Sequence, residues 1–429
     1  MEMITVDNKG DKYHNQLMLF RSKINRFFTK NKNPKPLFDS VKFVDDIVPP
    51  PDFICLDDFK KAQAFLKCYT GSIGTFNSYR RELERLLQWS WLVVQKPLQD
   101  LKREDIEDLI QFCIKPPKSW IGTKKVARFV GSKDNRKPNH EWRPFVATVS
   151  KSAFKKGESP TIKDFVFSNE SLKETFAILS SFFNYLIQEE YVLQNPVVLI
   201  RQKSKFIQKN QGMRQIRRLS SKQWQYVLNT AKLMALRDPS SHERTLFILS
   251  ILYGMYLRIS ELAANQRWSP AMNHFIKDDD GNWWFITVGK GNKKRQIAVS
   301  DSVLETLKRW RAHLKLSPLP TPADTSPLIP KTKGSGPISH TNYIRVLVQR
   351  CFDEAIAQLK LDNHMDESEA LMEATVHWLR HTGISDDVKI RPREHVRDDA
   401  GHSSSAITDR YINIELKERH ASAKSKPLE

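Results

Sequence analysis

The chain has 429 residues, of which 69 are Lys or Arg and 49 are Asp or Glu, so its formal net charge at pH 7 is +20. This length allows two or three domains, and a hydrophobic fraction of 40% with ten tryptophans argues against wholesale disorder. The positive charge is typical of a protein that binds a polyanion. Nucleic acid is favoured over a membrane, because the longest nearly apolar run, residues 246–257, is well short of the ~20 residues that span a bilayer.

The cysteines and the N-terminus bear on the compartment. The four cysteines show no metal-binding spacing, and the first residues show no signal-peptide pattern. We therefore expect free thiols in a reducing cytoplasm.

The first 50 residues are predicted to be an N-terminal extension. They open polar, include a basic, helix-like segment over residues 14–30, and end in a loop with prolines at positions 49–51. A solvated, partly ordered tail is the interpretation that we favour slightly. The alternative is a strap that lies on DNA or on a neighbouring subunit.

Residues 51–200 are predicted to form a helical domain. Apolar residues at helical spacing indicate a helix over residues 57–69, a second helix begins near Thr75, and a third begins near Leu101. A wide apolar stripe over residues 171–199 indicates a further helix that packs in the core.

An insertion interrupts this domain at residues 115–168. It contains thirteen Lys or Arg but four Asp or Glu, with aromatic residues between the basic ones. Such a segment can follow a phosphate backbone while its rings pack or stack. A disordered, solvated loop is the alternative.

Residues 201–218 are predicted to be a basic linker between two helical blocks. They contain seven Lys or Arg and no acidic residue. A protein that closes around a duplex needs such a segment, so Arg214, Arg217 and Arg218 are candidate DNA contacts.

The second domain is predicted to span residues 219–429. Ser220 or Ser221 can cap its first helix, and a three-stranded stretch is predicted over residues 274–299. Lys290 lies at a Gly-Asn turn between two strand-like runs of that stretch.

Residues 377–411 carry the clearest chemical pattern. His377 and Arg380 are three positions apart, so on a helix they share one face and can converge on an anion that also needs a proton moved. His402 follows a glycine, and the serines after it can cap a helix that carries Tyr411. A phenol becomes a useful nucleophile when cations surround it and a base lies within reach.

An arginine and a lysine upstream complete a larger pattern. Arg258 lies in Leu-Arg-Ile-Ser-Glu-Leu, and Lys290 lies in Gly-Lys-Gly-Asn-Lys-Lys-Arg. With the segments His-Trp-Leu-Arg-His-Thr-Gly and Gly-His-Ser-Ser-Ser, these resemble the four signature segments of the tyrosine recombinases, the phage integrase family, in their order and spacing. The resemblance is strongest over residues 252–412. It implies a catalytic set of Arg258, Lys290, His377, Arg380, His402 and Tyr411.

One stretch departs from the family's pattern. Between Arg380 and Gly401 the family usually has an apolar helix rich in small residues, whereas residues 385–394 are polar and are interrupted by Pro392. We expect this difference to affect the packing beneath the site and not the catalytic set.

The resemblance implies a fold and a reaction. We expect a mainly α-helical chain with a small antiparallel β-sheet in the catalytic domain, and a helical core-binding domain that forms a clamp around DNA together with it. Tyr411 would attack a DNA phosphodiester, forming a 3′-phosphotyrosyl link and a free 5′-hydroxyl. A 5′-hydroxyl from another duplex would then attack that link and rejoin the strands.

The resemblance also implies a role for each residue of the set. Arg258 and Arg380 would hold the non-bridging oxygens, and Lys290 would protonate the leaving 5′-oxygen. His377 would receive the proton of the tyrosine, and His402 would hydrogen-bond the phosphate. These cations would supply the positive charge that other enzymes take from Mg²⁺, so we expect no metal and no cofactor.

Further residues are assigned around this set. Glu261 is interpreted as the partner that steers Arg258, in preference to a solvated charge. His381 and the tryptophans at positions 283 and 284 are interpreted as structural. In the first domain, the segment that begins at Thr75 resembles the segment of the family's core-binding domain that lies against DNA. For Arg80 and Arg81, an ordinary solvated helix face is an equal alternative. The candidate DNA contacts on the two domains are Thr75, Tyr79, Arg80, Arg81, Lys293, Lys294 and Arg295.

Three functions are compatible with the sequence. The first is the integrase of a mobile element, acting in the cytoplasm and on the nucleoid of a bacterium, which the N-terminal extension and the insertion favour. The second is a housekeeping resolvase of chromosome or plasmid dimers, and the third is a non-catalytic DNA-binding protein on this fold. We expect a monomer in free solution and a homotetramer on paired recombination sites, with residues 412–417 donated to a neighbouring subunit. An accessory directionality factor is a further candidate partner.

Overall fold

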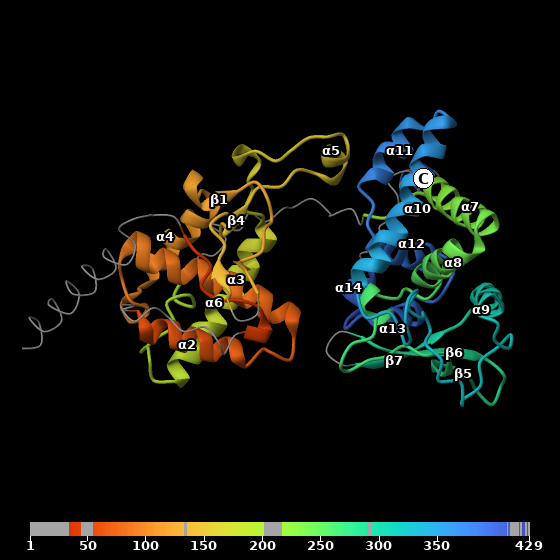
Figure 1. Cartoon of the computed structure of the whole chain (residues 1–429), viewed down its shortest axis with the longest axis horizontal. Coiled ribbons are helices and arrows are strands. Elements are labelled where there is room, and N and C mark those ends of the chain that lie inside the picture. The colour runs from red at the N-terminus through yellow and green to blue at the C-terminus, as the bar shows by residue number, and fades with distance from the viewer. Residues whose placement is uncertain are drawn as a thin grey trace, which may run out of the picture. The chain divides into compact units, whose positions relative to one another are not determined.

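The computed structural model describes residues 34–43, 55–132, 135–200, 217–289 and 293–409, together with positions 411, 420, 423, 424 and 427. The chain divides into two compact units, Met1–Gln211 and Gly212–Glu429. Helices dominate both units, and the second also carries a small antiparallel sheet (Figure 1). The predicted fold class, mainly α-helical with this sheet, is confirmed.

Four helices form the frame of the first unit. Phe76, Leu83 and Leu87 lie on one face of α3 (Ile73–Trp89) and are fully buried, as the helical period requires. That helix continues into one π-helical turn, Ser90–Val94. The four helices are α2 (Leu56–Lys67), α3 (Ile73–Trp89), α4 (Arg103–Ile114) and α6 (Asn169–Gln188).

The described part of the N-terminal extension packs against this frame. The backbone N–H groups of Leu37 and Phe38 both donate to Oε1 of Glu84 on α3 at 3.1 Å. The Phe38 side chain is fully buried and its ring stacks on Phe59 of α2, with 4.9 Å between the centroids. The prediction of a solvated tail is therefore wrong for residues 34–43, because their apolar side chains and backbone donors find partners on α2 and α3.

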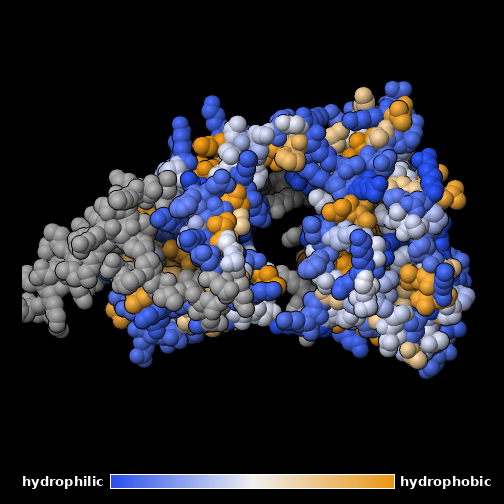
Figure 2. All heavy atoms as spheres, viewed as in Figure 1, coloured by the Kyte–Doolittle hydropathy of each residue, from blue (hydrophilic) through white to orange (hydrophobic). Residues whose placement is uncertain are grey.

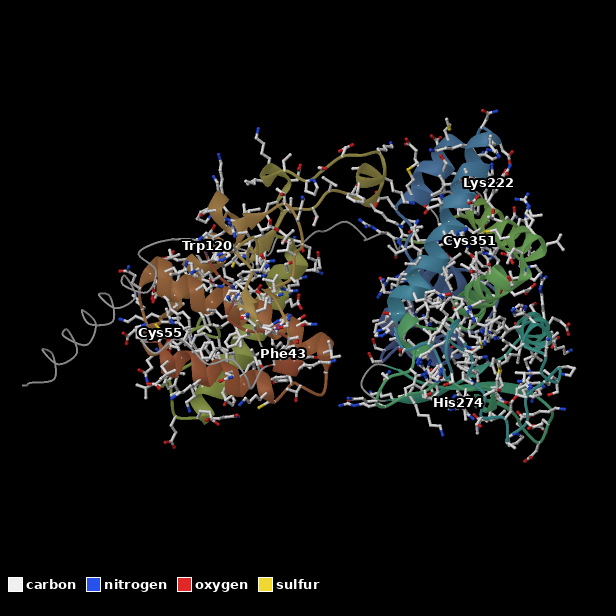
Figure 3. The ribbon with its side chains drawn as sticks, viewed as in Figure 1. Phe43, Cys55, Trp120, Lys222, His274 and Cys351 are labelled. Carbon is white, nitrogen blue, oxygen red and sulfur yellow. The ribbon has the colours of Figure 1, made fainter. Side chains whose placement is uncertain are left out.

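The insertion is ordered and contributes to the core of the first unit. Trp120 (labelled in Figure 3) and Phe145 are buried among the side chains of the helical frame. Arg128 lies over the ring of Trp142, 5.3 Å from its centroid. The disordered-loop alternative is therefore wrong for its described residues. Its elements are β1 (Ile121–Gly122), β2 (Phe129–Val130), β3 (Lys137–Pro138), β4 (Phe145–Val146) and α5 (Lys151–Lys155), in which β1 pairs with β4 in parallel and β2 pairs with β3 in antiparallel fashion.

The second unit is built around α8 (Pro239–Gly254). Leu246, Phe247, Ile248, Leu249, Ile251 and Leu252 are all buried, so this helix is covered on every side. Ser220 caps the N-terminus of α7 (Ser221–Arg237), the helix before α8, by accepting a hydrogen bond from the N–H of Gln223, as predicted. The other helices are α7 (Ser221–Arg237), α9 (Asp301–His313), α10 (Thr341–Leu361), α11 (Met365–Met372), α12 (Val376–Asp387), α13 (Arg393–Ala400) and α14 (Ser405–Asp409).

The sheet of the second unit has the antiparallel strand order β5-β6-β7. Its strands are β5 (Phe275–Lys277), β6 (Trp283–Val288) and β7 (Lys294–Ala298). Phe285 pairs with Phe275 on one side and Ile297 on the other, and all three side chains are buried. The sheet therefore turns this face to the core, and the side chains on its other face, such as Trp284 and Ile286, are half-buried.

On the face drawn in Figure 2, the coloured residues are mainly hydrophilic, with small separate apolar spots. Within the described residues, no helix is both long enough and apolar enough to cross a membrane.

Candidate active site

Helix α12 carries one wall of the candidate site. Leu379 and Ile384 on this helix are fully buried and fix which face it turns to the core. At Gly383 the helix approaches the end of α8 so closely that an added Cβ would lie 2.1 Å from the carbonyl oxygen of Tyr253. This close approach places Arg380, one turn earlier, beneath the C-terminus of α13.

The C-terminus of α13 gathers three arginines. Its last carbonyl groups have no partner within the helix, and the negative end of the helix dipole lies there. Three consecutive carbonyls of this terminus each accept a hydrogen bond from a guanidinium. The pairs are Asp399 with Arg295 Nε at 3.0 Å, Ala400 with Arg380 Nη2 at 2.6 Å, and Gly401 with Arg258 Nη2 at 3.4 Å.

Gly401 ends α13 in the left-handed region, at φ = 62°. Glycine is favoured there because the left-handed conformation is sterically unfavourable for residues that have a Cβ. A Cβ at this position would also lie 2.8 Å from Cδ of Arg295. Gly401 therefore allows the turn that leads to His402 and lets Arg295 pass beside it.

Glu261 joins two of these arginines. It is 1% exposed and receives Nη1 and Nη2 of Arg295 at 2.6 and 2.8 Å. It also accepts the backbone N–H of Arg258 at 2.8 Å and Nη1 of that residue at 3.1 Å. Burial alone would raise the pKa of Glu261, but the hydrogen bonds and charges of Arg295 and Arg258 lower it below its usual value. Glu261 is therefore an anion that fixes both guanidinium groups.

Exposure separates the three arginines. The side chain of Arg258 is 28% exposed and that of Arg295 is 10% exposed. Arg380 is 2% exposed, and its Nη1 donates to the carbonyl of Tyr256. Burial and the charge of Arg258 lower the pKa of Arg380 to about 9, which still leaves it cationic at pH 7. The cluster is thus a concentrated positive charge whose most accessible member is Arg258.

Tyr411 lies against two histidines. Its Oη is 2.6 Å from Nδ1 of His381, and its ring stacks on His402 at 5.6 Å between centroids. The ring of His377 packs edge-on against His381, with 4.2 Å between centroids. His402 is held in turn by Thr408, whose Oγ1 is 2.8 Å from its Nδ1.

His381, interpreted as structural from the sequence, contacts the phenol of Tyr411 directly, a contact that sequence reasoning missed. The signal was its spacing: His381 follows His377 by four positions and Arg380 by one, so the two histidines share a face of α12. The expectation that a helix carries Tyr411 is wrong. Helix α14 ends at Asp409, and Tyr411 follows in a turn.

The two imidazoles beside Tyr411 are neutral near pH 7. Burial first, and then the charges of His377 and Arg380, lower the pKa of His381 to about 3. Burial and the charges of Arg380 and Arg258 lower the pKa of His402 to about 4. The pKa of His377 is also lowered, mainly by burial. A neutral imidazole has one ring nitrogen that accepts a hydrogen bond, so Nδ1 of His381 is available to the hydroxyl of Tyr411.

The other sequence candidates of the second unit fall into three groups. Lys290 and Arg214 lie outside the described residues. Lys293, Lys294 and Arg217 are exposed, and Nη1 of Arg218 is 3.5 Å from Asp386. Arg295 was predicted to meet phosphates near the Lys290 turn, and its guanidinium is turned inward to Glu261 and the carbonyl of Asp399. Its contact with phosphate stays a prediction.

The candidates of the first unit lie on α3. Arg80 is 8% exposed and donates to the carbonyl of Asp39 and to Oδ1 of Asn77. The solvated-face alternative for Arg80 is wrong, because residues 34–43 cover it, and its DNA contact stays a prediction. The remaining three are partly exposed. Arg81 pairs with Glu82 and Glu174, Tyr79 stacks on Phe65, and Thr75 Oγ1 is 2.9 Å from Ser72 Oγ.

Within the part of the chain that the structure describes, no group of three or more His, Cys, Asp or Glu side chains is placed to hold a metal ion. The site instead consists of arginines, histidines and a tyrosine, a set suited to binding an anion and moving a proton.

Comparisons with known proteins find relatives of this chain. The sequence model of the Phage integrase family matches residues 217–418. The chain is 24% identical to the tyrosine recombinase XerC of Alcanivorax borkumensis over 253 residues, which cover 58% of this chain and 70% of the relative. It is 24% identical to the tyrosine recombinase XerD of Staphylococcus saprophyticus over 252 residues, which cover 58% and 72%.

Among solved structures, the fold is similar to that of the XerH site-specific recombinase bound to its palindromic difH substrate in a post-cleavage complex. The TM-score is 0.53 at 14% sequence identity, and the match covers 96% of both chains. At this identity the similarity concerns the fold.

Proposed function

The chain belongs to the phage integrase family of tyrosine recombinases, and we propose that it is a site-specific DNA strand transferase with Tyr411 as its nucleophile. One observation carries the proposal: the phenol of Tyr411 contacts a neutral imidazole at 2.6 Å, next to arginines gathered on the C-terminus of α13. This set contains a nucleophile, a proton acceptor and an anion-binding group. Nucleophilic attack on a phosphodiester requires all three.

The first step is attack of Oη of Tyr411 on the phosphorus of a DNA phosphodiester. The O–P bond to tyrosine forms as the bond from phosphorus to the 5′-oxygen breaks, leaving a 3′-phosphotyrosyl link. The phenolic proton passes to Nδ1 of His381, the nitrogen that Oη contacts. This assignment replaces His377, the acceptor that the family resemblance implied, and gives His377 the role of supporting the ring of His381.

The arginines stabilise the charge that grows on the non-bridging oxygens in the transition state. Arg258 contacts the phosphate directly, because it is the most exposed of the three and Glu261 fixes its guanidinium. Arg380 lies deeper and supplies positive charge. Its two carbonyl partners use two of the five N–H donors of its guanidinium, so the others can hydrogen-bond the phosphate. His402 hydrogen-bonds the phosphate, and Lys290 gives its proton to the leaving 5′-oxygen.

The second step reverses the first with a new 5′-hydroxyl. The bond energy is kept in the phosphotyrosyl link, so rejoining needs no nucleotide cofactor. Exchange between two duplexes breaks and rejoins four strands, so we propose that four subunits assemble on paired sites. The first unit would act as the core-binding domain and close with the catalytic unit around DNA.

Two biological roles share this chemistry. The ordered, basic insertion of the first unit favours an integrase of a mobile element, because a minimal resolvase does not obviously need it. The Xer relatives favour the alternative, a resolvase of chromosome or plasmid dimers. Loss of the gene separates the two: failure of chromosome dimer resolution would identify the resolvase, and loss of excision of a flanking element would identify the integrase.

The chemical proposal is tested with DNA of unspecified sequence. The protein is incubated with a pool of random-sequence duplexes and denatured, and the DNA that stays covalently attached is amplified and sequenced. We expect the wild-type protein to recover a defined site, and Tyr411→Phe to bind that site without forming an adduct. An adduct that survives denaturation with the Phe variant would remove Tyr411 from the reaction.

A further inference from the structure

The guanidinium of Arg391, between α12 and α13, bridges two segments of the catalytic unit. Its Nη1 donates to the hydroxyl of Tyr256 at 2.9 Å and lies 3.3 Å from Oδ2 of Asp387. Its Nη2 donates to Oδ2 of Asp399 at 2.6 Å. The hydroxyl of Tyr256 in turn donates to Asp387. One cation thus holds the segment after α8 and the last turn of α13.

Both ends of this bridge bear a carbonyl group that orients an arginine. The carbonyl of Tyr256 accepts Nη1 of Arg380, and the carbonyl of Asp399 accepts Nε of Arg295 at 3.0 Å. Arg295 in turn holds Glu261, the carboxylate that contacts Arg258. A shift of either segment would therefore move a guanidinium of the candidate site.

The two segments need to be held. Tyr256 has φ = 50°, in the left-handed region that is unfavourable for a residue with a Cβ, and such a conformation persists where the surroundings fix it. Its side chain is 1% exposed, so the phenol is anchored from inside the protein. Asp399 is 5% exposed, and its Oδ1 also accepts the N–H of Ala298 on β7 at 3.2 Å.

We infer that Arg391 is a positioning residue, which sets the geometry of the phosphate-binding arginines through Tyr256 and Asp399. The inference rests on the proposed function, because it assigns Arg391 to the support of that site. It also gives a physical role to the polar stretch where this chain departs from the family's apolar helix. Buried and half-buried polar groups are retained there because they form a connected network that ends at the active site.

The competing explanation is that the network only stabilises the fold. In that case, replacing Arg391 would lower the melting temperature and reduce cleavage only by the fraction of protein that unfolds. A positioning residue behaves differently: its loss slows the chemical step while folding and DNA affinity are kept, because a small displacement of a catalytic group strongly lowers the rate.

The experiment uses the full chain and the duplex that the wild-type protein selects from the random-sequence pool. Arg391→Met removes the contacts with Tyr256, Asp387 and Asp399 and keeps the aliphatic volume. Arg391→Lys keeps the charge without the fork that bridges two acceptors. Tyr256→Phe removes only the hydroxyl. Arg345→Met is the matched control, because Arg345 is an exposed residue of α10 whose Nη1 donates to Thr341. Adduct formation rate, DNA affinity and melting temperature are measured for each variant.

We expect Arg391→Met and Arg391→Lys to slow adduct formation about 10- to 100-fold with near wild-type DNA affinity. Tyr256→Phe should slow it less, and the Tyr256→Phe/Arg391→Met double variant should be no slower than Arg391→Met, because both changes break one network. The control should cleave at the wild-type rate. Wild-type cleavage by Arg391→Met, or additive losses in the double variant, would overturn the inference. If Arg391→Met does not fold, wild-type cleavage by a folded Tyr256→Phe variant would also overturn it. Absence of any adduct with the wild-type protein would instead reject the proposed function.

Discussion

Nδ1 of His381 lies 2.6 Å from Oη of Tyr411. The ring of His377 packs against the ring of His381, with 4.2 Å between their centroids, and not against Tyr411. The family resemblance directs attention to His377, the histidine three positions before Arg380. In the structure it is His381 that contacts the phenol of Tyr411.

The first prediction is that His381→Ala slows adduct formation by about 100-fold or more, the range expected for loss of a proton acceptor. His377→Ala should cost less, because it removes a packing partner of the acceptor. The measurement is the single-turnover rate of adduct formation on the selected duplex. A greater loss in His377→Ala than in His381→Ala would return the acceptor role to His377.

The second prediction separates Arg258 and Arg380 by the burial of their side chains. Arg258→Lys should lose most cleavage with little change in stability, because its side chain is partly exposed and the ammonium cannot reproduce the fork. Arg380→Lys should lose cleavage and also about 1–3 kcal/mol of stability, because a lysine cannot serve both the Tyr256 and Ala400 carbonyls. Denaturant unfolding and adduct formation are measured together. Equal stability of the two variants would contradict the structural difference between these positions.

The third prediction concerns stability at low pH. An unfolded histidine titrates near pH 6.5, whereas the folded pKa is about 3 for His381 and about 4 for His402. Above pH 6.5 both states are neutral and contribute no pH dependence. As the pH falls below 6.5, the unfolded chain binds protons that the folded chain does not, so the free energy of unfolding decreases, by at most about 1.4 kcal/mol per pH unit for each histidine.

The test of this pH dependence compares the wild-type protein with His381→Gln between pH 7.5 and 5. The variant should lose less stability over this range, because its side chain does not titrate. Parallel stability curves for the two proteins would show that His381 is not held neutral by the fold.

Sequence reasoning located most of the helices and the sheet because their apolar patterns are local, as in the buried Phe76, Leu83 and Leu87 at helical spacing on α3 and the short strand-like run Trp283–Val288 of β6. It could not foresee which arginines turn inward. The carbonyl partner of Arg80 is 41 positions away, and the carboxylate partner of Arg295 is 34 positions away. Whether a charged side chain is exposed or buried depends on such distant partners, and a single sequence does not show them.

The same limit applies to the carbonyl groups of the site. The His377–Arg380 spacing predicts a shared helix face, but no side-chain pattern shows that three successive backbone carbonyls at the end of α13 receive three arginines. Backbone acceptors carry no residue-specific signal. The nearest clue in the sequence is Gly401, which permits the left-handed turn that ends the helix.

The last prediction tests the packing of residues 34–43 on the first unit. Phe38→Ala should destabilise this unit by about 3–5 kcal/mol, because a fully buried ring is removed. Glu84→Gln should cost about 1–3 kcal/mol, since the Arg128 Nε that donates to Oε2 at 2.9 Å would then face an amide donor. Hydrogen exchange along α3 of the full chain is the measurement, with the exposed Lys42→Ala as the control. We expect faster hydrogen exchange along α3 in Phe38→Ala and Glu84→Gln, and exchange at the wild-type rate in Lys42→Ala. Wild-type protection in Phe38→Ala would mean that this segment does not stabilise the helical frame.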